Sequence, residues 1–348
     1  AAEPAPPPPV DPAALARQAR AEQLAGQLES MRRCERQFAE ACRDLRRVND
    51  AVQGEPDRAR EASQQLALAL MDKMLVDGDL CVRVLGDPQG DRFSAHVMNV
   101  AVISLMLGRA LGFDRNAMLD LGVGALLHDV GKLSLPDRLR LPHDNFSTSE
   151  QNHYQEHVAL GVAQGRRMGL SPQVLLTIAQ HHELADGSGY PSGAPLEKQV
   201  TPARVVSMVN HYDNLCNAAS IAKSLTPHEA LSRMFAHSRS KFDAVMLNAF
   251  IRLMGIYPPG SLVQLSDERY GMVMSVNSAR PLKPRVLVVD PGVPAAQSLH
   301  VDLDQAPELS IRRSLRSDQL PGRAFDYLMP RQRVAYFFDI EASQEEAA

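Results

Sequence analysis

The stretch Leu126-Leu127-His128-Asp129-Val130-Gly131-Lys132 is the part of this chain from which its fold and chemistry are best inferred. An apolar run ends in an adjacent histidine and aspartate, and a glycine and a lysine follow at once. About fifty residues downstream, His181-His182 precede the turn Asp186-Gly187-Ser188-Gly189-Tyr190-Pro191. Imidazole and carboxylate groups are typical ligands of transition metals. The two stretches together therefore predict a metal site.

The composition is that of an ordinary globular protein. Of the 348 residues, 45% are hydrophobic and 22% are charged, and the formal net charge is −4. This charge balance gives no basic surface for nucleic acid or for an anionic membrane. The four cysteines contain no CxxC pair, which argues against a zinc ribbon or a disulfide scaffold and fits a reducing compartment. We therefore expect a cytoplasmic protein that binds no nucleic acid.

No membrane span is expected either. The most apolar stretch, 97–107, is shorter than the roughly 20 residues that cross a bilayer, and it contains Asn99. No signal-like segment opens the chain. The first residue is not methionine, and the sequence leaves open whether a further domain precedes it.

The N-terminal part of the chain divides into a Pro-rich lead and two helices. Residues 1–12 should be extended and disordered. From 13 to 52, apolar residues recur at alternating spacings of four and three, but two positions of that seam, Glu35 and Asn49, are polar. This helix is either a dimerising coiled coil or an amphipathic helix packed on its own domain. With a second helix near 58–75, the region 13–85 is a candidate for homodimerisation or regulation.

The rest of the chain predicts a mainly α fold with a small β-rich subdomain at its C-terminal end. Apolar periodicity predicts further helices at 93–111, 119–128, 149–168, 173–183, 201–219 and 227–253. Short β-branched runs separated by turn residues predict strands at 261–265, 271–276, 285–290 and 299–303. We expect a β-rich subdomain at 256–340 and a disordered tail at 341–348.

Five of the 11 histidines lie where they could converge with Asp129. They are His96, His128, His157, His181 and His182. A single histidine in a helix is more often a core or surface residue, but this combination favours a metal site. Because a carboxylate has two oxygens, Asp129 can bridge two ions. Two metals about 3.5 to 4 Å apart activate water and neutralise the charge of a phosphodiester during hydrolysis. Lys132 is then either a phosphate-binding lysine or a surface lysine at a helix end.

Three motifs carry a resemblance to a known family. They are HDVGK at 128–132, HHELADGSGYP at 181–191, and Ala203-Arg204-Val205-Val206 leading into Tyr212-Asp213. Together they resemble the HD-GYP family, a branch of the HD phosphohydrolases, most of whose active members hydrolyse the bacterial second messenger cyclic di-GMP. The resemblance implies an HD-type helical bundle over 86–255 and a metal-dependent hydrolase in signal transduction.

The resemblance also implies roles for individual residues. His96, His128 and Asp129 would hold the first metal, with Asp129 bridging, and His157, His181 and His182 would complete the second. Asn210 lies at the position of the last metal ligand. Asp129 and Lys132 would be catalytic. Cyclic di-GMP would contact Lys132, Gly189, Tyr190, Pro191 and Asp213. The cofactor would be two divalent transition-metal ions, with Fe or Mn expected and Zn or Ni as alternatives.

This sequence departs from the family pattern at three places. Arg92 replaces a glutamate of the members that hold three metals, so at most two are expected. Asn210 replaces an aspartate ligand, and its neutral amide binds a transition metal more weakly. Family members also carry an arginine soon after this position, where Lys223 is the only nearby cation.

Three functional hypotheses follow. The first is a cyclic di-GMP phosphodiesterase, and the second is a catalytically weak module that senses cyclic di-GMP or binds a partner protein. A third, a phosphohydrolase of another nucleotide, is disfavoured by the Gly189-Tyr190-Pro191 turn.

Overall fold

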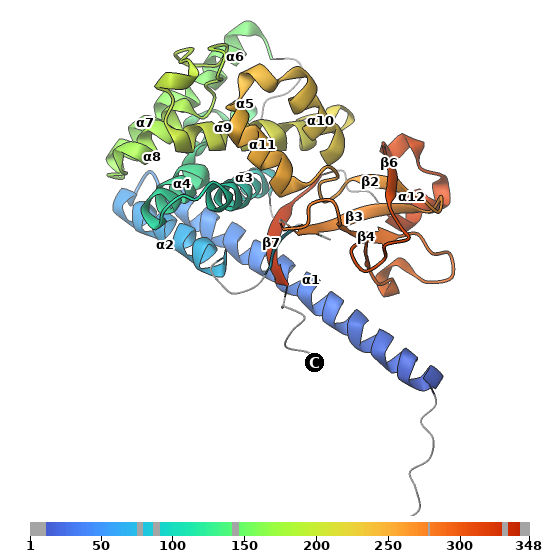
Figure 1. Cartoon of the computed structure of the whole chain (residues 1–348). Helices are drawn as coiled ribbons and strands as arrows, with labels where there is room; N and C mark the ends of the chain where they lie inside the picture. Colours follow the sequence, from blue (N-terminus) through green and yellow to red (C-terminus); the bar gives the residue numbers. More distant parts are fainter. Residues whose placement is uncertain are drawn as a thin grey trace, which may run out of the picture.

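The computed structural model describes residues 12–74, 79–85, 91–140, 146–277, 279–328 and 333–341. The Pro-rich lead before residue 12 and the tail after residue 341 lie outside these ranges. Within them the protein is mainly α, with a helical bundle and a small antiparallel sheet formed largely by the C-terminal part of the chain. The predicted fold class is confirmed. Figure 1 shows the bundle and the sheet side by side, with the long N-terminal helix running past both.

The N-terminal helices are α1 (Pro12–Ala51) and α2 (Pro56–Met74). The second half of α1 is packed on its own domain, where Phe38 and Leu45 are fully buried. In the first half, Leu15 is 53% exposed, and Gln27 hydrogen-bonds to the loop before the strand at 301–302. Part of the apolar seam of α1 therefore packs against other helices and strands of the same chain, and dimerisation stays a prediction.

The bundle packs around α3 (Arg92–Ala110), which is buried on nearly all sides. Helices α4 (Arg115–Leu127) and α9 (Thr201–Cys216) contact α3, and α8 (Pro172–Gln180) packs against both of them. Among the described residues, α3 is the one helix long and apolar enough to cross a membrane. However, 72% of its most apolar window is buried inside the protein, which is typical of a core helix.

The helix expected at 149–168 is divided in two, α6 (Thr148–Gln155) and α7 (His157–Arg167). The division has a local cause. The carbonyl oxygen of Tyr154 accepts a hydrogen bond from the His157 side chain at 2.6 Å, and the Glu156 N–H bonds to the His153 carbonyl three residues back. The tightened turn directs His157 inward. A 3-10 turn, Val130–Ser134, and the short helix α5 (Asp137–Arg140) precede this pair. Two further helices, α10 (Pro227–His237) and α11 (Ala244–Met254), follow α9.

In the described parts of the chain, the sheet has seven antiparallel strands in the order β5-β4-β3-β1-β7, with β2 joining β3 to β6. The strands from the C-terminal part are β2 (Leu262–Leu265), β3 (Tyr270–Asn277), β4 (Arg285–Val288), β5 (Val301–Asp302), β6 (Ile311–Leu315) and β7 (Tyr336–Glu341). A short helix, α12 (Gly322–Leu328), precedes β7. Strand β1 (Asp79–Val84) comes from the N-terminal region and was not anticipated. The division of the chain into separate regions stays a prediction.

The entry to β7 joins the sheet to the bundle. The backbone N–H of Tyr336 donates to the Asn99 side chain on α3 at 2.9 Å. The Val334 N–H donates to the Asn217 side chain, just beyond α9, also at 2.9 Å. Residues 333–336 therefore lie against the two helices that carry much of the candidate site.

Candidate metal centre

The centre is built where α4 ends and α7 begins. His128 caps the C-terminal end of α4, and Asp129 precedes the 3-10 turn at 130–134. Gly131 allows that turn to approach α7 closely, because a Cβ at residue 131 would lie only 1.9 Å from the carbonyl oxygen of His157. Backbone contact at the glycine therefore brings His157 beside Asp129.

Asp129 is a buried carboxylate with histidines on both of its oxygens. Its Oδ2 lies 3.3 Å from His128 Nε2 and 3.5 Å from His96 Nε2. Its Oδ1 lies 3.5 Å from His157 Nε2 and 3.6 Å from His181 Nε2. His182 joins the second set, whose ligand atoms all lie within 4.8 Å of one another, as do those of the first. The two groups of ligand atoms share the Asp129 carboxylate, and each has the residue types that could hold a metal ion.

The imidazoles present lone pairs to these sites. In His128, His157 and His181, Nδ1 lies 2.6–2.8 Å from the backbone carbonyl three residues earlier. A carbonyl can only accept, so Nδ1 carries the proton and Nε2 of the neutral ring carries the lone pair. The Nε2 atoms of His157 and His181 face each other at 3.3 Å. Two lone pairs so close repel each other, and a cation bound by both removes the repulsion.

Three buried polar atoms in the centre have no hydrogen-bond partner among the described residues. They are Nε2 of His128, Nε2 of His182 and Oδ1 of Asp129. Leaving such atoms unpaired costs roughly 1–3 kcal/mol each. All three belong to the two ligand sets, so the residues present fit a pair of divalent metal ions.

Protonation also suits metal binding. Burial lowers the pKa of His157 to about 3 and lowers the pKa values of His128 and His182, so these imidazoles are neutral at pH 7. Burial would raise the pKa of Asp129, but the charge of Lys132 holds it well below its usual value. For His96, burial is outweighed by hydrogen bonds to Asp129 and Asp213, which raise its pKa to about 9. Metal binding at His96 must therefore release a proton.

Lys132 is a buried cation at the edge of the centre. Its Nζ donates to Asp129 Oδ2 at 2.6 Å and lies 5.1 Å from the centroid of the Tyr154 ring. Burial alone would lower the pKa of Lys132, but the Asp129 carboxylate outweighs it and the pKa is raised. The surface-lysine reading is therefore wrong, and a permanent positive charge lies beside the candidate metal ligands.

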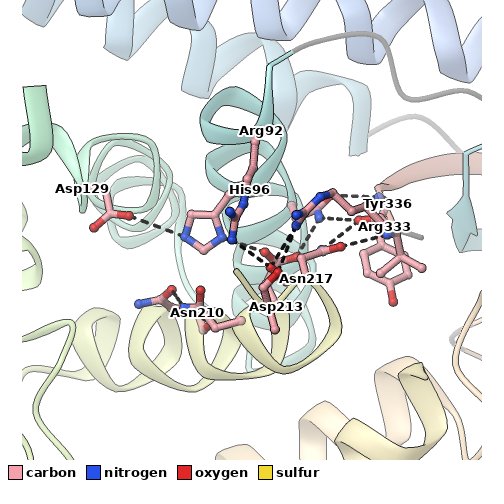
Figure 2. Close-up of polar contacts among 12 residues, drawn as sticks. Arg92, His96, Asp129, Asn210, Asp213, Asn217, Arg333 and Tyr336 are labelled. Carbon is pink, nitrogen blue, oxygen red and sulfur yellow. Dashed lines mark hydrogen bonds and ion pairs between the residues drawn. The ribbon is translucent and has the colours of Figure 1, made fainter. Parts of the chain in front are cut away.

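Asp213 orients His96. Its Oδ2 accepts from His96 Nδ1 at 2.6 Å, and its Oδ1 accepts from Asn99 at 2.7 Å and from Asn217 at 2.9 Å. Figure 2 shows His96 lying between Asp129 and Asp213. The carboxylate is fully buried in this network. Its role toward substrate stays a prediction, and the positioning role was missed, although a polar Asn99 inside an apolar helix was a signal of it.

Asn210 lies on α9, one turn before Asp213, and is buried. Its Oδ1 accepts a hydrogen bond from the side chain of Asn214 at 2.7 Å. Figure 2 shows both Asn210 and Asp213 on this helix, beneath His96. The predicted role of Asn210 as a metal ligand stays a prediction.

The Gly189-Tyr190-Pro191 turn supports a histidine of the second set. A Cβ on Gly189 would lie 2.4 Å from the carbonyl oxygen of His182, so only glycine fits there. The Tyr190 ring stacks on the His182 imidazole with centroids 4.4 Å apart and planes 19° apart. The turn therefore fixes the orientation of His182. Contact of these three residues with a substrate stays a prediction.

A pocket of about 410 Å³ adjoins the centre. His96 and Lys132 form its border with the ligand cluster, and Tyr154 lines it beside them. Arg92, from the first turn of α3, and Arg333, from the segment before β7, line it as well. Arg333 was not anticipated, because it lies 120 positions after Asp213 and belongs to no motif.

Comparison with known proteins agrees with this geometry. Residues 83–246 match the HD domain family. The chain is 32% identical to a cyclic di-GMP phosphodiesterase of Pseudomonas aeruginosa, over 56% of this chain and 47% of the relative. It is 22% identical to a cyclic di-GMP phosphodiesterase of Borreliella burgdorferi, over 55% of this chain and 50% of the relative.

A more distant relative has a different named substrate. The chain is 25% identical to the 3'3'-cGAMP-specific phosphodiesterase 2 of Vibrio cholerae, over 45% of this chain and 30% of that protein. This chain spans about half the length, or less, of the curated relatives it matches. Motifs and relatives agree that residues 83–246 are similar to HD domains of the HD-GYP type.

Proposed function

We propose that this chain is a metal-dependent phosphodiesterase that hydrolyses cyclic di-GMP in bacterial second-messenger signalling. The observation that carries the proposal is the buried Asp129, which has a separate set of histidines on each of its two oxygens. A carboxylate shared in this way is the arrangement that a two-metal phosphodiesterase needs.

The two ligand sets would hold two divalent ions, with Fe or Mn expected from the mixed imidazole and carboxylate donors. His96, His128 and Asp129, with Asn210 as a weaker fourth donor, form the first set. Asp129, His157, His181 and His182 form the second. When bound, the ions supply an activated water and neutralise charge on the attacking and leaving oxygens.

Other side chains prepare the site for a phosphodiester. The Lys132 ammonium is held beside Asp129 and lines the pocket, so it can donate to a phosphate oxygen and offset the charge that develops there. Asp213 keeps the His96 ring in one tautomer and one orientation. Tyr190 stacks on the His182 ring and Gly189 lies against the His182 backbone, so both hold His182 in one orientation.

The pocket and the relatives support a cyclic dinucleotide as the substrate. A volume of about 410 Å³ falls in the range of about 300–1,000 Å³ that is usual for small-molecule sites. Two of the relatives reported above are named as cyclic di-GMP phosphodiesterases, and one is named as specific for 3'3'-cGAMP. The comparison of cyclic di-GMP with 3'3'-cGAMP therefore belongs in the first assay.

The test measures metal content and turnover together. Protein purified without oxygen should carry close to two metal ions per chain and should linearise cyclic di-GMP. Asp129→Ala should abolish turnover and lower the metal content, while Asp326→Ala, which removes an exposed carboxylate on α12, should change neither. Less than one metal per chain and no turnover with added Mn or Fe would refute the enzyme.

Asn210 favours a second candidate function, a catalytically weak module that senses cyclic di-GMP or binds a partner. An amide donor lacks the negative charge of an aspartate, and the Asn210 oxygen already accepts a hydrogen bond from Asn214. This alternative predicts that the wild-type protein binds cyclic di-GMP without hydrolysing it. Calorimetric binding measured beside turnover separates the two functions.

A further inference from the structure

Two arginines from distant parts of the chain line the same pocket. Arg92 begins α3, and Arg333 lies three residues before β7. Arg92 Nη2 donates to the backbone carbonyl of Asn217 at 3.4 Å, and Arg333 Nη1 donates to the same carbonyl at 3.3 Å. Arg333 also donates to the Ala218 carbonyl at 3.2 Å. Figure 2 shows both guanidinium groups beside Asn217.

The two guanidinium groups are held by carbonyls and not by carboxylates. Neither Arg92 nor Arg333 has an ion pair with a described residue. Asp91 and Asp213 have other partners, since Asp91 caps α3 and pairs with Arg46, while Asp213 accepts from His96, Asn99 and Asn217. A guanidinium has five N–H donors, and the carbonyls engage only a few of them. Donors and positive charge are therefore left facing the pocket.

Holding two like charges together is costly unless an anion offsets them. Partial burial and the neighbouring Arg333 lower the pKa of Arg92, which reports that repulsion. Lys132 adds a third cation to the same pocket wall. A pocket that collects three cations is suited to an anionic ligand, and paired arginines match the oxygens of a phosphodiester.

The position of the pair indicates which phosphate it meets. Arg92 and His96 are four residues apart on one helix, so they share a face and are separated by about 6 Å along the axis. A phosphate on the arginines is thus one helical turn from a phosphate at the ligand cluster. A cyclic dinucleotide carries two phosphodiesters in one ring, and one can lie at each place.

We infer that Arg92 and Arg333 form a phosphate clamp that binds the phosphodiester of a cyclic dinucleotide that is not being cleaved. The inference rests on the proposed function and adds to it a specificity-determining pair. It assigns the C-terminal segment that precedes β7 a direct part in ligand binding. A substrate with a single phosphodiester has nothing to place on this clamp.

The test compares two substrates in Arg92→Gln, Arg333→Gln and the double variant. For cyclic di-GMP, each single change should raise KM about tenfold, which corresponds to one charge-assisted hydrogen-bonded contact. For bis(p-nitrophenyl) phosphate, which has one phosphodiester, kcat/KM should stay at the wild-type value. Arg333→Lys should fall between wild type and Arg333→Gln, because it keeps the charge and loses the fork.

Binding without turnover gives an independent readout. With the metal-loaded protein and a non-hydrolysable phosphorothioate analogue of cyclic di-GMP, calorimetry should show the dissociation constant rising about tenfold in each single variant. Arg115→Gln and Arg323→Gln, at exposed positions of α4 and α12, are matched controls and should bind as wild type does. A wild-type unfolding temperature in every variant, together with wild-type kcat/KM for the single-phosphodiester substrate, would exclude a folding defect.

The outcomes separate the two proposals. Wild-type affinity and KM for cyclic di-GMP in the double variant would overturn the clamp and leave the phosphodiesterase standing. An equal loss on both substrates would also overturn it, because the arginines would then act at the cleaved phosphate or on the fold. Wild-type protein that binds cyclic di-GMP in an arginine-dependent way but never cleaves it supports the clamp and refutes the enzyme. No binding by the wild type refutes both.

Discussion

Replacing Gly131 with alanine should disable the candidate metal centre, although it replaces none of the candidate ligand residues. A Cβ on residue 131 would lie 1.9 Å from the His157 carbonyl oxygen and 2.5 Å from the Gly161 nitrogen. Both are backbone atoms of α7, so no side chain can move aside, and the 3-10 turn must separate from α7 by about 1 Å. His157 begins α7 and moves with it.

Overpacking of this kind costs roughly 1–3 kcal/mol of unfolding free energy. A displacement of about 1 Å at a catalytic group lowers turnover about 100-fold. Because the displaced His157 belongs to the second ligand set and not to the first, we expect metal content to fall from about two ions to about one per chain.

The assay combines elemental analysis, thermal unfolding and cyclic di-GMP turnover. Gly26→Ala is the matched control, because a Cβ there meets nothing within 4 Å. Gly26 lies within α1, where alanine should stabilise the helix by up to about 1 kcal/mol and leave the metal centre unchanged. A Gly131→Ala protein with wild-type metal content and turnover would refute the argument that this backbone contact positions His157.

Three further changes test other parts of the molecule. Asn210→Asp should raise metal content and turnover, because a carboxylate binds a transition metal more tightly than an amide. Asp213→Asn should lower the pKa of His96 from about 9, as followed by NMR in the metal-free protein, because one of its two carboxylate partners loses its charge. The urea midpoint should fall as the pH drops from about 6.5 to about 4, because burial lowers the pKa of His211 to about 4 and the unfolded chain then binds the extra proton. His211→Phe should reduce that loss, by at most about 3 kcal/mol.

Each of these predictions has a contrary outcome. Unchanged metal content in Asn210→Asp would show that residue 210 lies outside the ligand set. A His96 pKa that stays near 9 in Asp213→Asn would contradict the contact between the two side chains. An acid profile that is the same in His211→Phe would assign the sensitivity to another group. His300, whose pKa burial lowers to about 3, would be the next to replace.

The helical bundle and the candidate metal ligands follow from local patterns in the sequence. Apolar patterns placed α3, α4, α8 and α9 within a few residues of their observed ends, because the apolar residues of these helices are buried in the bundle. The two compound motifs contain Asp129, His128, His181 and His182. With His157 and His96 these residues form two groups, and the ligand atoms within each group lie within 4.8 Å of one another. Short motifs carry this information because close backbone contacts, as at Gly131 and Gly189, tolerate only one residue type.

The way in which distant segments complete the site follows from long-range packing, which no local pattern reports. Strand β1 lies between β3 and β7, and pairing between strands so far apart in sequence leaves no local periodicity to detect. Asp213 serves His96 because α9 lies beside α3, and Arg333 faces Arg92 because β7 returns to the bundle from the far end of the chain. The charge of the pocket depends on these long-range contacts, since a side chain's partners are set by packing and not by its neighbours in the sequence.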